Sequence, residues 1–295
     1  MVDEHPPAIE PQELRPGTLY VVPTPIGNLG DLSPRARALF AHVDLLACED
    51  TRETRRLLAA LHLPFRGELM SCHDHNEVQR APAIVERLQG GQTVALVSDA
   101  GTPTCSDPGF RVVAAVAAAG LRIVPLPGPV AFMTALSGSG LPSDRVLFVG
   151  FLPHKGAHRR TVLEGLAAQT ATLALYVSPH RVLDVLADAI VVLGDRQACV
   201  ARELTKFHEE LLRGPLSELR DLLAERDAIL GEIVLLVEGA PEAVPTTDLD
   251  EARRLVASMT RAGVPARAIK TVVAEHCGIS KNDAYALALE LGEGR

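Results

Sequence analysis

Four polar loops in the first half of the chain each follow a short apolar run. They begin at Pro23 (PTPIGNLGD), Glu49 (EDTRETRR), Ser71 (SCHDHNE) and Asp99 (DAGTPTCSDPG). Carboxylates and imidazoles can exchange protons with a bound molecule, and turns that contain glycine can offer it backbone N–H groups. If the apolar runs are parallel strands, all four loops open at the same edge of one sheet. The sequence therefore predicts one site assembled from several loops.

The loop at Asp99 has the groups to bind a ligand that carries hydroxyls and a carboxylate. Asp99 would accept hydrogen bonds from the hydroxyls, and the backbone of Ala100 and Gly101 would present N–H groups to the ligand. A nucleoside joined to an amino acid is one such ligand. An ordinary turn is the alternative, because Asp, Gly and Pro all favour turns.

The loop at Pro23 lacks the G-x-G-x-x-G pattern of a dinucleotide site. It contains only Gly27 and Gly30, and Pro23 and Pro25 stiffen it, so we expect it to bind something other than a pyrophosphate. The helix that follows has a clear start signal, with Ser33 as the N-cap and a proline in the first helical position.

The loop at Glu49 combines acids with guanidinium groups. Glu49 or Asp50 can act as a base or an orienting carboxylate, while the neighbouring Arg52, Arg55 and Arg56 can bind phosphate in bidentate fashion. Acids in the first turn of a helix also pair with the helix dipole, which is a purely structural role. The spacing of these residues leaves both interpretations open.

The loop at Ser71 places two histidines at alternate positions, as on one face of a strand. His73 and His75 lie beside Cys72 and Asp74, so a metal site has to be considered. Two histidines supply half of a typical site, and no further pair follows nearby. The pattern favours a hydrogen-bonded polar cluster, with a metal-dependent hydrolase as the alternative.

Apolar runs alternate with segments of helical periodicity along most of the chain. This alternation predicts an α/β fold with mostly parallel sheets. Proline-rich stretches interrupt it near residue 127 and again after residue 240. We therefore predict a disordered leader over residues 1–16, two α/β domains over 17–127 and 128–240, and a small helical tail over 241–295.

The composition is that of an acidic globular protein. Its 295 residues carry a net charge of −8, with 47% hydrophobic residues and no apolar run long enough to span a membrane. The start of the sequence lacks a signal-peptide pattern and the five cysteines form no C-x-x-C pair, so we expect a cytoplasmic protein. A nucleic-acid partner would need local positive charge. Two tracts offer it: FLPHKGAHRR from Phe151, and residues 253–281, with six Lys or Arg and one acid.

Nine segments together resemble one known family. Their order and spacing are those of the ribosomal RNA small subunit methyltransferase I family, a branch of the tetrapyrrole-methylase-like superfamily: LYVVPTPIGNLGDLSPRA, CEDTRETRRLL, HDHNE, ALVSDAGTPTCSDPG, VVPLPGPVA, GLPSDRVLFVGFLPHK, VSPHR, ARELTK and GEIVLLVEG. The resemblance implies an α/β enzyme with two domains, a cleft between them for S-adenosylmethionine, and assembly as a homodimer. It also implies methyl transfer to the ribose 2′-hydroxyl of a cytidine in the decoding region of 16S rRNA, with the small ribosomal subunit as partner.

The resemblance assigns the cofactor pocket to two of the polar loops, the segment after PGP and the ends of later strands. The matching positions are Pro25, Ile26, Gly27, Asp99, Ala100, Gly101, Thr102, Val130, Ala131, Tyr176, Val177, Ala201 and Leu204. Val177 departs from the family, which usually has Glu in a YESPHR motif. Thr104 and Cys105 likewise replace a more usual apolar pair.

The implied reaction needs a base, because a ribose hydroxyl is a weak nucleophile. The candidates are Glu49, Asp50 and His73, with Asn76 as an orienting amide. The residues expected to bind RNA are Arg52, Arg55, Lys155, Arg159, Arg160, Arg181 and Lys206. With no Trp and 3% aromatic residues, phosphate contacts should dominate over base stacking. Two further alternatives are a methyltransferase of the same superfamily that acts on a tetrapyrrole carbon and a ribosome-assembly factor without activity.

Overall fold

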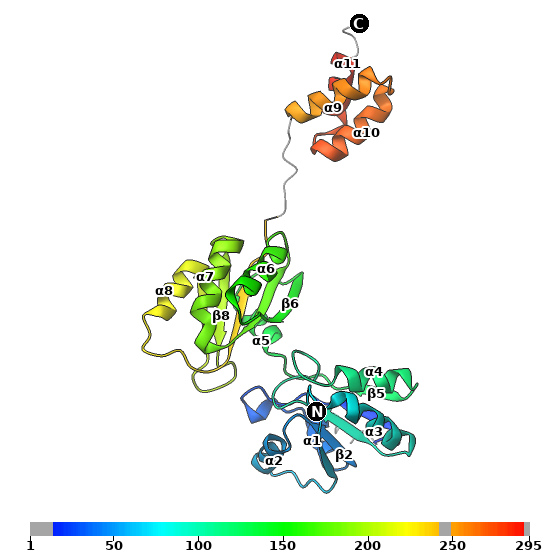
Figure 1. Ribbon diagram of the computed structural model, residues 1–295, viewed down its shortest axis with the longest axis vertical. Helices are drawn as coiled ribbons and strands as arrows, with labels where there is room; N and C mark the ends of the chain where they lie inside the picture. Colours follow the sequence, from blue (N-terminus) through cyan, green and yellow to red (C-terminus); the bar gives the residue numbers. More distant parts are fainter. Residues whose placement is uncertain (1–13, 242–248, 292–295) are drawn as a thin grey trace, which may run out of the picture. The chain divides into compact units, whose positions relative to one another are not determined.

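The computed structural model describes residues 14–241 and 249–291. The chain divides into two compact units at Ala240, and the first unit contains two five-stranded sheets (Figure 1). Each sheet lies within one of the predicted α/β domains, 17–127 and 128–240, although the boundaries themselves stay a prediction. Residues 1–13 of the predicted leader lie outside the described residues.

The first sheet is entirely parallel. Its strands are β1 (Thr18–Val21), β2 (Leu45–Cys48), β3 (Glu68–Ser71), β4 (Val94–Val97) and β5 (Arg122–Pro125), in the order β3-β2-β4-β1-β5. Strands β1, β2 and β4 are buried at every position because helices cover both faces of the sheet. The carboxyl ends of β1 to β4 share one edge, which confirms that the four polar loops leave the sheet on the same side.

Four helices cover this sheet, two on each face. They are α1 (Pro34–Phe40), α2 (Thr51–Ala60), α3 (Glu77–Gln89) and α4 (Phe110–Ala118). Helices α1 and α2 share a core with Tyr20 and Leu46, whereas α3 and α4 share a core with Leu19 and Leu45. Successive residues of β1 and β2 thus enter opposite cores, as the alternation of side chains along a strand requires.

Side chains of the segment after β1 cap the two helical turns that begin there. A short 3-10 helix, η1 (Leu29–Asp31), begins where the Asn28 side chain accepts a 2.9 Å hydrogen bond from the N–H of Gly30. The predicted start of α1 is confirmed, since the Ser33 hydroxyl accepts a 3.1 Å hydrogen bond from the N–H of Ala36.

The second sheet is mixed, so the prediction of mostly parallel sheets was wrong for this part of the chain. Its strands are β6 (Val146–Phe151), β7 (Thr172–Val177), β8 (Gln197–Arg202), β9 (Glu210–Pro215) and β10 (Ile233–Val237), in the order β6-β7-β10-β8-β9. Only β6 and β7 pair in parallel. Strand β9 was not predicted, and it follows β8 after a loop too short for a crossover helix, so the two strands pair antiparallel.

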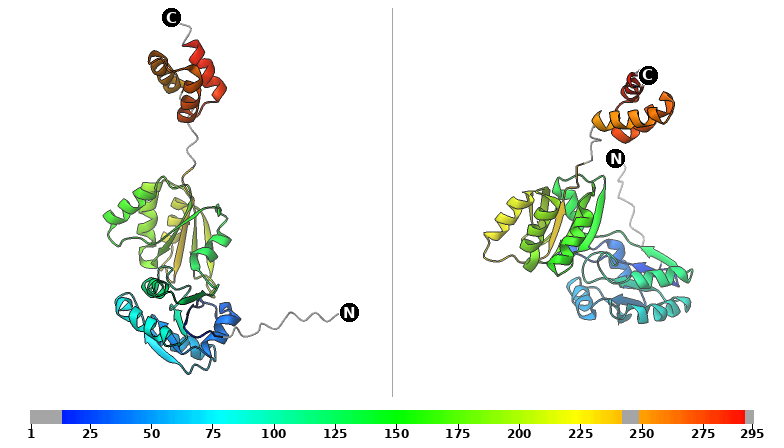
Figure 2. Two further views of the ribbon diagram at one scale, coloured as in Figure 1. Left: turned by 90° about the vertical axis from the view of Figure 1, so that its right-hand side faces the viewer. Right: turned by 45° about the horizontal axis from the view of Figure 1, so that its top comes forward.

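Helices also cover both faces of the second sheet, as Figure 2 shows. On one face lie α6 (Gly156–Leu166), α7 (Val182–Leu193), preceded by the 3-10 turn η2 (Pro179–Arg181), and α8 (Leu216–Ala224). On the other face lies α5 (Ala131–Ser139), whose core also contains Ile26 and Leu204. Ile26 comes from the loop after β1, so this core joins the first loop to the second sheet.

The described part of the second unit consists of α9 (Leu249–Arg261), α10 (Ala266–Cys277) and α11 (Lys281–Glu290). These helices share a core that includes Val256 and Ile269. The region is helical, as the sequence predicted for the end of the chain. In the parts of the chain that the structure describes, no helix has both the length and the apolar character needed to cross a membrane.

Candidate active-site pocket

A cavity of ≈ 370 Å³ lies within the first unit and is lined by residues that come from both sheets. The volume falls in the range of ordinary small-molecule sites. The first sheet contributes the loops after β1, β2, β4 and β5, and the second contributes the ends of β6, β7 and β8 and the start of β10. The lining is mostly apolar, and its acidic residues are Glu49, Asp99, Asp107 and Glu232, the last of which pairs with Lys206.

Most of the residues expected to bind the cofactor come together around this cavity. They are Ile26, Asp99, Ala100, Gly101, Thr102, Val130, Ala131, Tyr176, Val177, Ala201 and Leu204. Pro25 and Gly27 do not line it. Sequence reasoning missed the contributions of Cys105, Ser106, Asp107, Phe151, Ser178, Pro179, Gly231, Glu232, Ile233 and Val234. The last four lie at β10, which has no distinctive polar motif and is brought to the pocket only by pairing within the sheet.

Gly27 allows the loop after β1 to pack closely against the loop after β8. A Cβ at this position would lie 2.5 Å from Cγ of Lys206 and 2.7 Å from Oγ1 of Thr205. The neighbouring N–H of Asn28 donates a 3.0 Å hydrogen bond to that same Thr205 hydroxyl. The absence of a side chain therefore lets the loop after β1 lie directly on the loop after β8, which supplies Leu204 to the pocket.

The loop after β8 has a strained backbone that an ion pair stabilises. Glu203 and Thr205 adopt left-handed conformations, with φ of 51° and 66°. The Glu203 carboxylate accepts hydrogen bonds from Lys206 Nζ at 2.8 Å and from the N–H of Glu232 at 3.0 Å. These bonds hold the ARELTK segment against β10.

The loops after β1 and β4 are joined through their backbones. The N–H of Thr24 donates to the carbonyl of Gly101 at 2.9 Å, and the N–H of Gly101 donates to the carbonyl of Thr24 at 3.1 Å. The sequence suggested that the Gly101 N–H would be available to a ligand, but this bridge uses it. Gly101 has a φ of +87°, so the glycine is required here by the turn.

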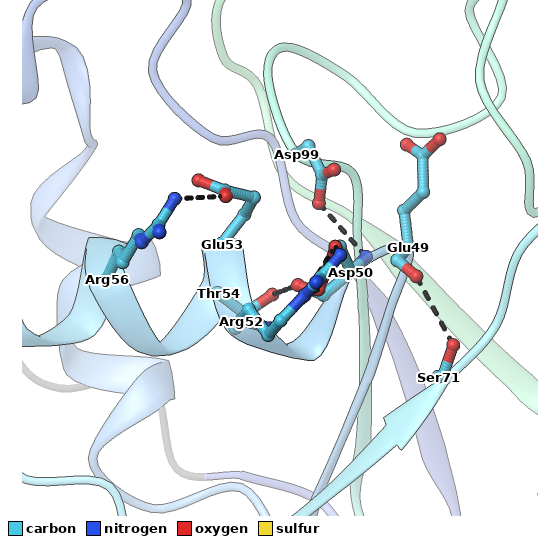
Figure 3. Close-up of polar contacts among 8 residues, drawn as sticks. All are labelled: Glu49, Asp50, Arg52, Glu53, Thr54, Arg56, Ser71 and Asp99. Atoms are coloured by element: carbon cyan, nitrogen blue, oxygen red, sulfur yellow. Dashed lines mark hydrogen bonds and ion pairs between the residues drawn. The ribbon is translucent and has the colours of Figure 1, made fainter.

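Asp50 is the N-cap of α2, which is the structural alternative noted for this acid. Its carboxylate accepts a 2.8 Å hydrogen bond from the N–H of Arg52 and forms a 2.5 Å ion pair with the same residue (Figure 3). The side-chain hydrogen bond from Arg52 lowers the pKa of Asp50 to about 2. Such a carboxylate is a poor proton acceptor near neutral pH.

Glu49 differs from its neighbour, because its carboxylate lines the pocket and has no ion pair within the described residues. Figure 3 shows its side chain pointing away from the contact between Asp99 Oδ1 and the N–H of Asp50, which is 3.1 Å long. Burial, followed by the charges of Asp99 and Asp74, raises the pKa of Glu49. Burial also raises the pKa of Asp99.

Asp107 is a further acidic residue of the pocket lining. Burial, followed by the negative charges of Glu49, Asp99 and Asp74, raises the pKa of Asp107 to about 7, while a hydrogen bond with Ser98 opposes the rise. The sequence signal was present, since Asp107 lies in the same loop as Asp99. The many turn-forming residues around Asp107 are also typical of an ordinary turn, so the sequence did not show that Asp107 faces a pocket.

Asn76 contacts both the backbone and the imidazole of His73, and its expected role as an orienting amide in the reaction stays a prediction. Its Oδ1 accepts a 2.8 Å hydrogen bond from the N–H of His73, and its Nδ2 lies 3.1 Å from Nε2 of the same residue. His73 and His75 follow the end of β3 in a turn, so they are not strand neighbours, and their ring centroids are 6.0 Å apart. The described residues contain no group of three or more His, Cys, Asp or Glu arranged to hold a metal ion. Neither histidine lines the pocket.

Arg159 does not present its charge to solvent, contrary to the expectation that it binds RNA. It is 5% exposed, and its guanidinium pairs with Asp188 of α7 at 2.6 Å. Arg160 reaches the other oxygen of Asp188 at 3.0 Å but keeps half of its side chain exposed. Lys155, at the N-cap of α6, is exposed.

The other predicted RNA-binding residues differ in how strongly they are engaged within the protein. Arg181 bonds to His154 Nδ1 at 2.7 Å and to the carbonyl of Pro153 at 3.0 Å, and Lys206 pairs with Glu203 and Glu232. Arg52 pairs with Asp50, yet its side chain is 80% exposed. Arg55 is exposed on α2.

The family model for tetrapyrrole (corrin/porphyrin) methylases matches residues 18–220. Ribosomal RNA small subunit methyltransferase I of Micromonospora olivasterospora is 47% identical over 269 residues, which cover 91% of this chain and 85% of that protein. The protein of the same name from Escherichia coli O157:H7 is 46% identical over 276 residues, covering 93% of this chain and 95% of that one.

Solved structures share the fold at low identity. The methyltransferase CobJ matches with a TM-score of 0.55 and 21% identity, over 76% of this chain and 95% of that chain. Uroporphyrin-III C-methyl transferase from Thermus thermophilus, complexed with S-adenyl homocysteine, matches with a TM-score of 0.51 and 16% identity, over 74% of this chain and 96% of that one. From the matched model and the full-length relatives it follows that the chain belongs to the ribosomal RNA small subunit methyltransferase I family, within the tetrapyrrole methylases.

Proposed function

We propose that the protein uses S-adenosylmethionine to methylate the ribose 2′-hydroxyl of a cytidine in the decoding region of 16S rRNA. The observation that carries the proposal is the agreement between family membership and the pocket, which gathers all the expected cofactor positions except Pro25 and Gly27. We further propose that the rRNA is presented in the small ribosomal subunit, and that the enzyme is cytoplasmic and homodimeric.

The residues of the pocket fit this cofactor. Asp99 and Glu49 offer carboxylate acceptors to ribose hydroxyls or an amino group, and Ile26, Val130 and Leu204 offer an apolar surface to an adenine ring. When bound, the cofactor supplies a methyl group on a positively charged sulfur. Four acidic residues and no lysine or arginine among the lining residues suit such a charge.

The first proposed role of the pocket residues is to position the substrate ribose against the cofactor. The ribose oxygen must approach the methyl carbon in line, and correct placement alone supplies several kcal/mol of the barrier. Of the predicted bases, Asp50 is committed to Arg52 and His73 lies outside the pocket lining, which leaves Glu49. Asn76, which contacts the backbone and the imidazole of His73, is proposed to orient that ring.

The proposed RNA surface consists of the exposed cations Arg52, Arg55, Lys155 and Arg160. Arg181 and Lys206 contribute mainly by holding the loops at the pocket, and buried Arg159 is left out of this surface. Because the chain is acidic as a whole, binding depends on these local charges and should weaken steeply as salt is added.

The test is to incubate the protein with labelled S-adenosylmethionine and either 30S subunits or naked 16S rRNA, and then to map the modified nucleotide. We expect one 2′-O-methylcytidine in the decoding region, formed with the subunit. Label incorporated into a tetrapyrrole and not into either RNA would overturn the proposal in favour of the tetrapyrrole alternative. Binding of the subunit without any methyl transfer would favour an assembly factor.

A further inference from the structure

The proposed mechanism gives no role to Asp107, an acidic residue of the pocket lining. Asp107 comes from the loop between β4 and α4 and faces the same cavity as Glu49 and Asp99. Glu49 follows β2 and Asp99 follows β4, and these two strands are hydrogen-bonded neighbours. The cavity wall therefore brings carboxylates from two adjacent strand ends and one long loop to the same place.

Several contacts fix the loop that carries Asp107. The N–H of Gly109 donates a 2.8 Å hydrogen bond to the carboxylate of Glu77, which is only 5% exposed and also pairs with Arg111 at 3.1 Å. Gly109 has a φ of +121°, a conformation that side chains disfavour. The end of the loop is thus attached to the start of α3.

The other side of the loop packs against the second sheet. Ser106 has a left-handed backbone, with φ of 63°, and a Cβ at Gly150 would lie 2.8 Å from its hydroxyl oxygen. Gly150 itself lies at a register shift between β6 and β7. Asp107 is therefore held from both sides, and a residue that must meet a reacting atom needs this kind of fixed position.

The surroundings of Asp107 contain acids and no paired cation. The titratable groups that face it are Glu49 after β2, Asp99 after β4, Asp74 after β3, Tyr176 on β7 and Cys105 on its own loop. Within the described residues, no lysine, arginine or histidine forms an ion pair with Asp107. Its situation is thus the opposite of that of Asp50, whose carboxylate is neutralised by Arg52.

We propose that Asp107 is the catalytic residue that accepts the proton of the ribose 2′-hydroxyl. This inference rests on the proposed function and changes its assignment of the base, because it gives Glu49 the role of a neighbouring charge. As the proton moves from the 2′-oxygen to the carboxylate, that oxygen forms a bond to the methyl carbon. The bond from this carbon to sulfur breaks, its electron pair stays on the sulfur, and Asp107 later releases the proton to water.

The negative charges near Asp107 make its carboxylate a stronger base in this mechanism. A carboxylate with a pKa near the working pH is a stronger base than an ordinary aspartate and is still partly ionised. Burial and the charge of Glu49 raise the pKa of Asp107 to about 7. Activity should therefore increase with pH through about 7, as Asp107 loses its proton and becomes able to accept one from the substrate.

The experiment compares Asp107→Asn, Asp107→Glu and Glu49→Gln with the wild-type protein. Single-turnover methylation of 30S subunits is followed from about pH 5 to 9, and cofactor binding is measured by calorimetry. Asp227→Asn, at an exposed acid outside the pocket, is the matched control and should behave as the wild type does. For Asp107→Asn we expect a rate lower by about 10²- to 10⁴-fold with unchanged cofactor affinity.

Each result decides the question. Wild-type rates in Asp107→Asn, or a loss of rate that only follows lost cofactor binding, would overturn the assignment. If Asp107→Asn does not fold, Asp107→Glu decides: the inflection of its pH profile must move, and an unmoved inflection shows that another group titrates. In Glu49→Gln the inflection should move to lower pH, because a negative neighbour is removed. A wild-type protein that leaves the RNA unmethylated refutes the proposed function itself, which is a distinct outcome.

Discussion

The backbone N–H of Asn28 donates a hydrogen bond of 3.0 Å to the hydroxyl of Thr205. This bond joins the loop after β1 to the loop after β8, so it connects the edge of the parallel sheet to the edge of the mixed one. Beside it, Gly27 has no side chain to separate the two loops. The shape of the pocket therefore depends on a contact between residues that lie far apart in the sequence.

Gly27→Ala should damage the pocket although Gly27 does not line it. The added methyl would meet Lys206 and Thr205 within 2.7 Å, so the loop that carries Leu204 must move. We expect a loss of about 1–3 kcal/mol in the free energy of unfolding, together with weaker cofactor binding. Denaturant unfolding and calorimetry measure the two effects. Gly165→Ala on α6 is the control, because a Cβ there meets nothing within 4 Å and should stabilise the helix by about 0.5–1 kcal/mol.

Asp50→Asn should keep most of the methylation rate. Asparagine is as good an N-cap as aspartate, so α2 retains its start. The structure gives Asp50 a partner in Arg52 and no free carboxylate for proton transfer. A fall in the single-turnover rate as large as that of Asp107→Asn would show that Asp50 takes part in the chemistry.

Replacing Glu77 should separate positioning from chemistry. In Glu77→Ala the N–H of Gly109 loses its buried acceptor, which costs about 1–3 kcal/mol of stability. The rate of methylation should fall as well, because Asp107 is less well held. Glu77→Gln retains an acceptor oxygen and should recover part of both losses. The inflection of the pH–rate profile should stay close to that of the wild type in both variants, since Asp107 is still the titrating group.

Two basic residues of the same segment should respond in opposite ways. Lys155→Ala removes an exposed charge and should weaken rRNA binding without changing stability, with a smaller salt slope in a binding assay. Arg159→Ala leaves the buried carboxylate of Asp188 with only the half-exposed Arg160 as a partner and should cost about 1–3 kcal/mol of stability. Measurable loss of RNA affinity in folded Arg159→Ala, beyond that of Lys155→Ala, would contradict the exclusion of Arg159 from the RNA surface.

Asp107→Asn should also stabilise the protein at alkaline pH. The folded pKa of Asp107 lies above its unfolded value, so its contribution to stability is present at low pH and is lost as pH rises through about 7. Asparagine carries no charge and avoids this loss. We expect the Tm of the variant to exceed that of the wild type at about pH 8.5 and to approach it only as the pH falls to about 4. If the variant and the wild type have equal Tm values at both pH values, the surroundings of Asp107 do not raise its pKa.

Local sequence determined much of the first sheet and of the loops at its edge. The short apolar runs, the Ser33 cap and the polar loops that follow the strands are encoded by neighbouring residues, because capping and side-chain alternation act over a few positions. The convergence of those loops then followed from the parallel pairing expected for alternating strands and helices. The family resemblance added half of the lining residues, position by position.

Only the tertiary structure decided which partner each group meets. It made the second sheet mixed, used the Gly101 N–H in a bridge to Thr24, buried Arg159 against Asp188 and brought Asp107 into the pocket. The residues next to each of these groups in the sequence do not predict these contacts. Strand pairing, burial and the field of nearby charges depend on segments tens of residues away, and a carboxylate acquires its chemistry from that environment.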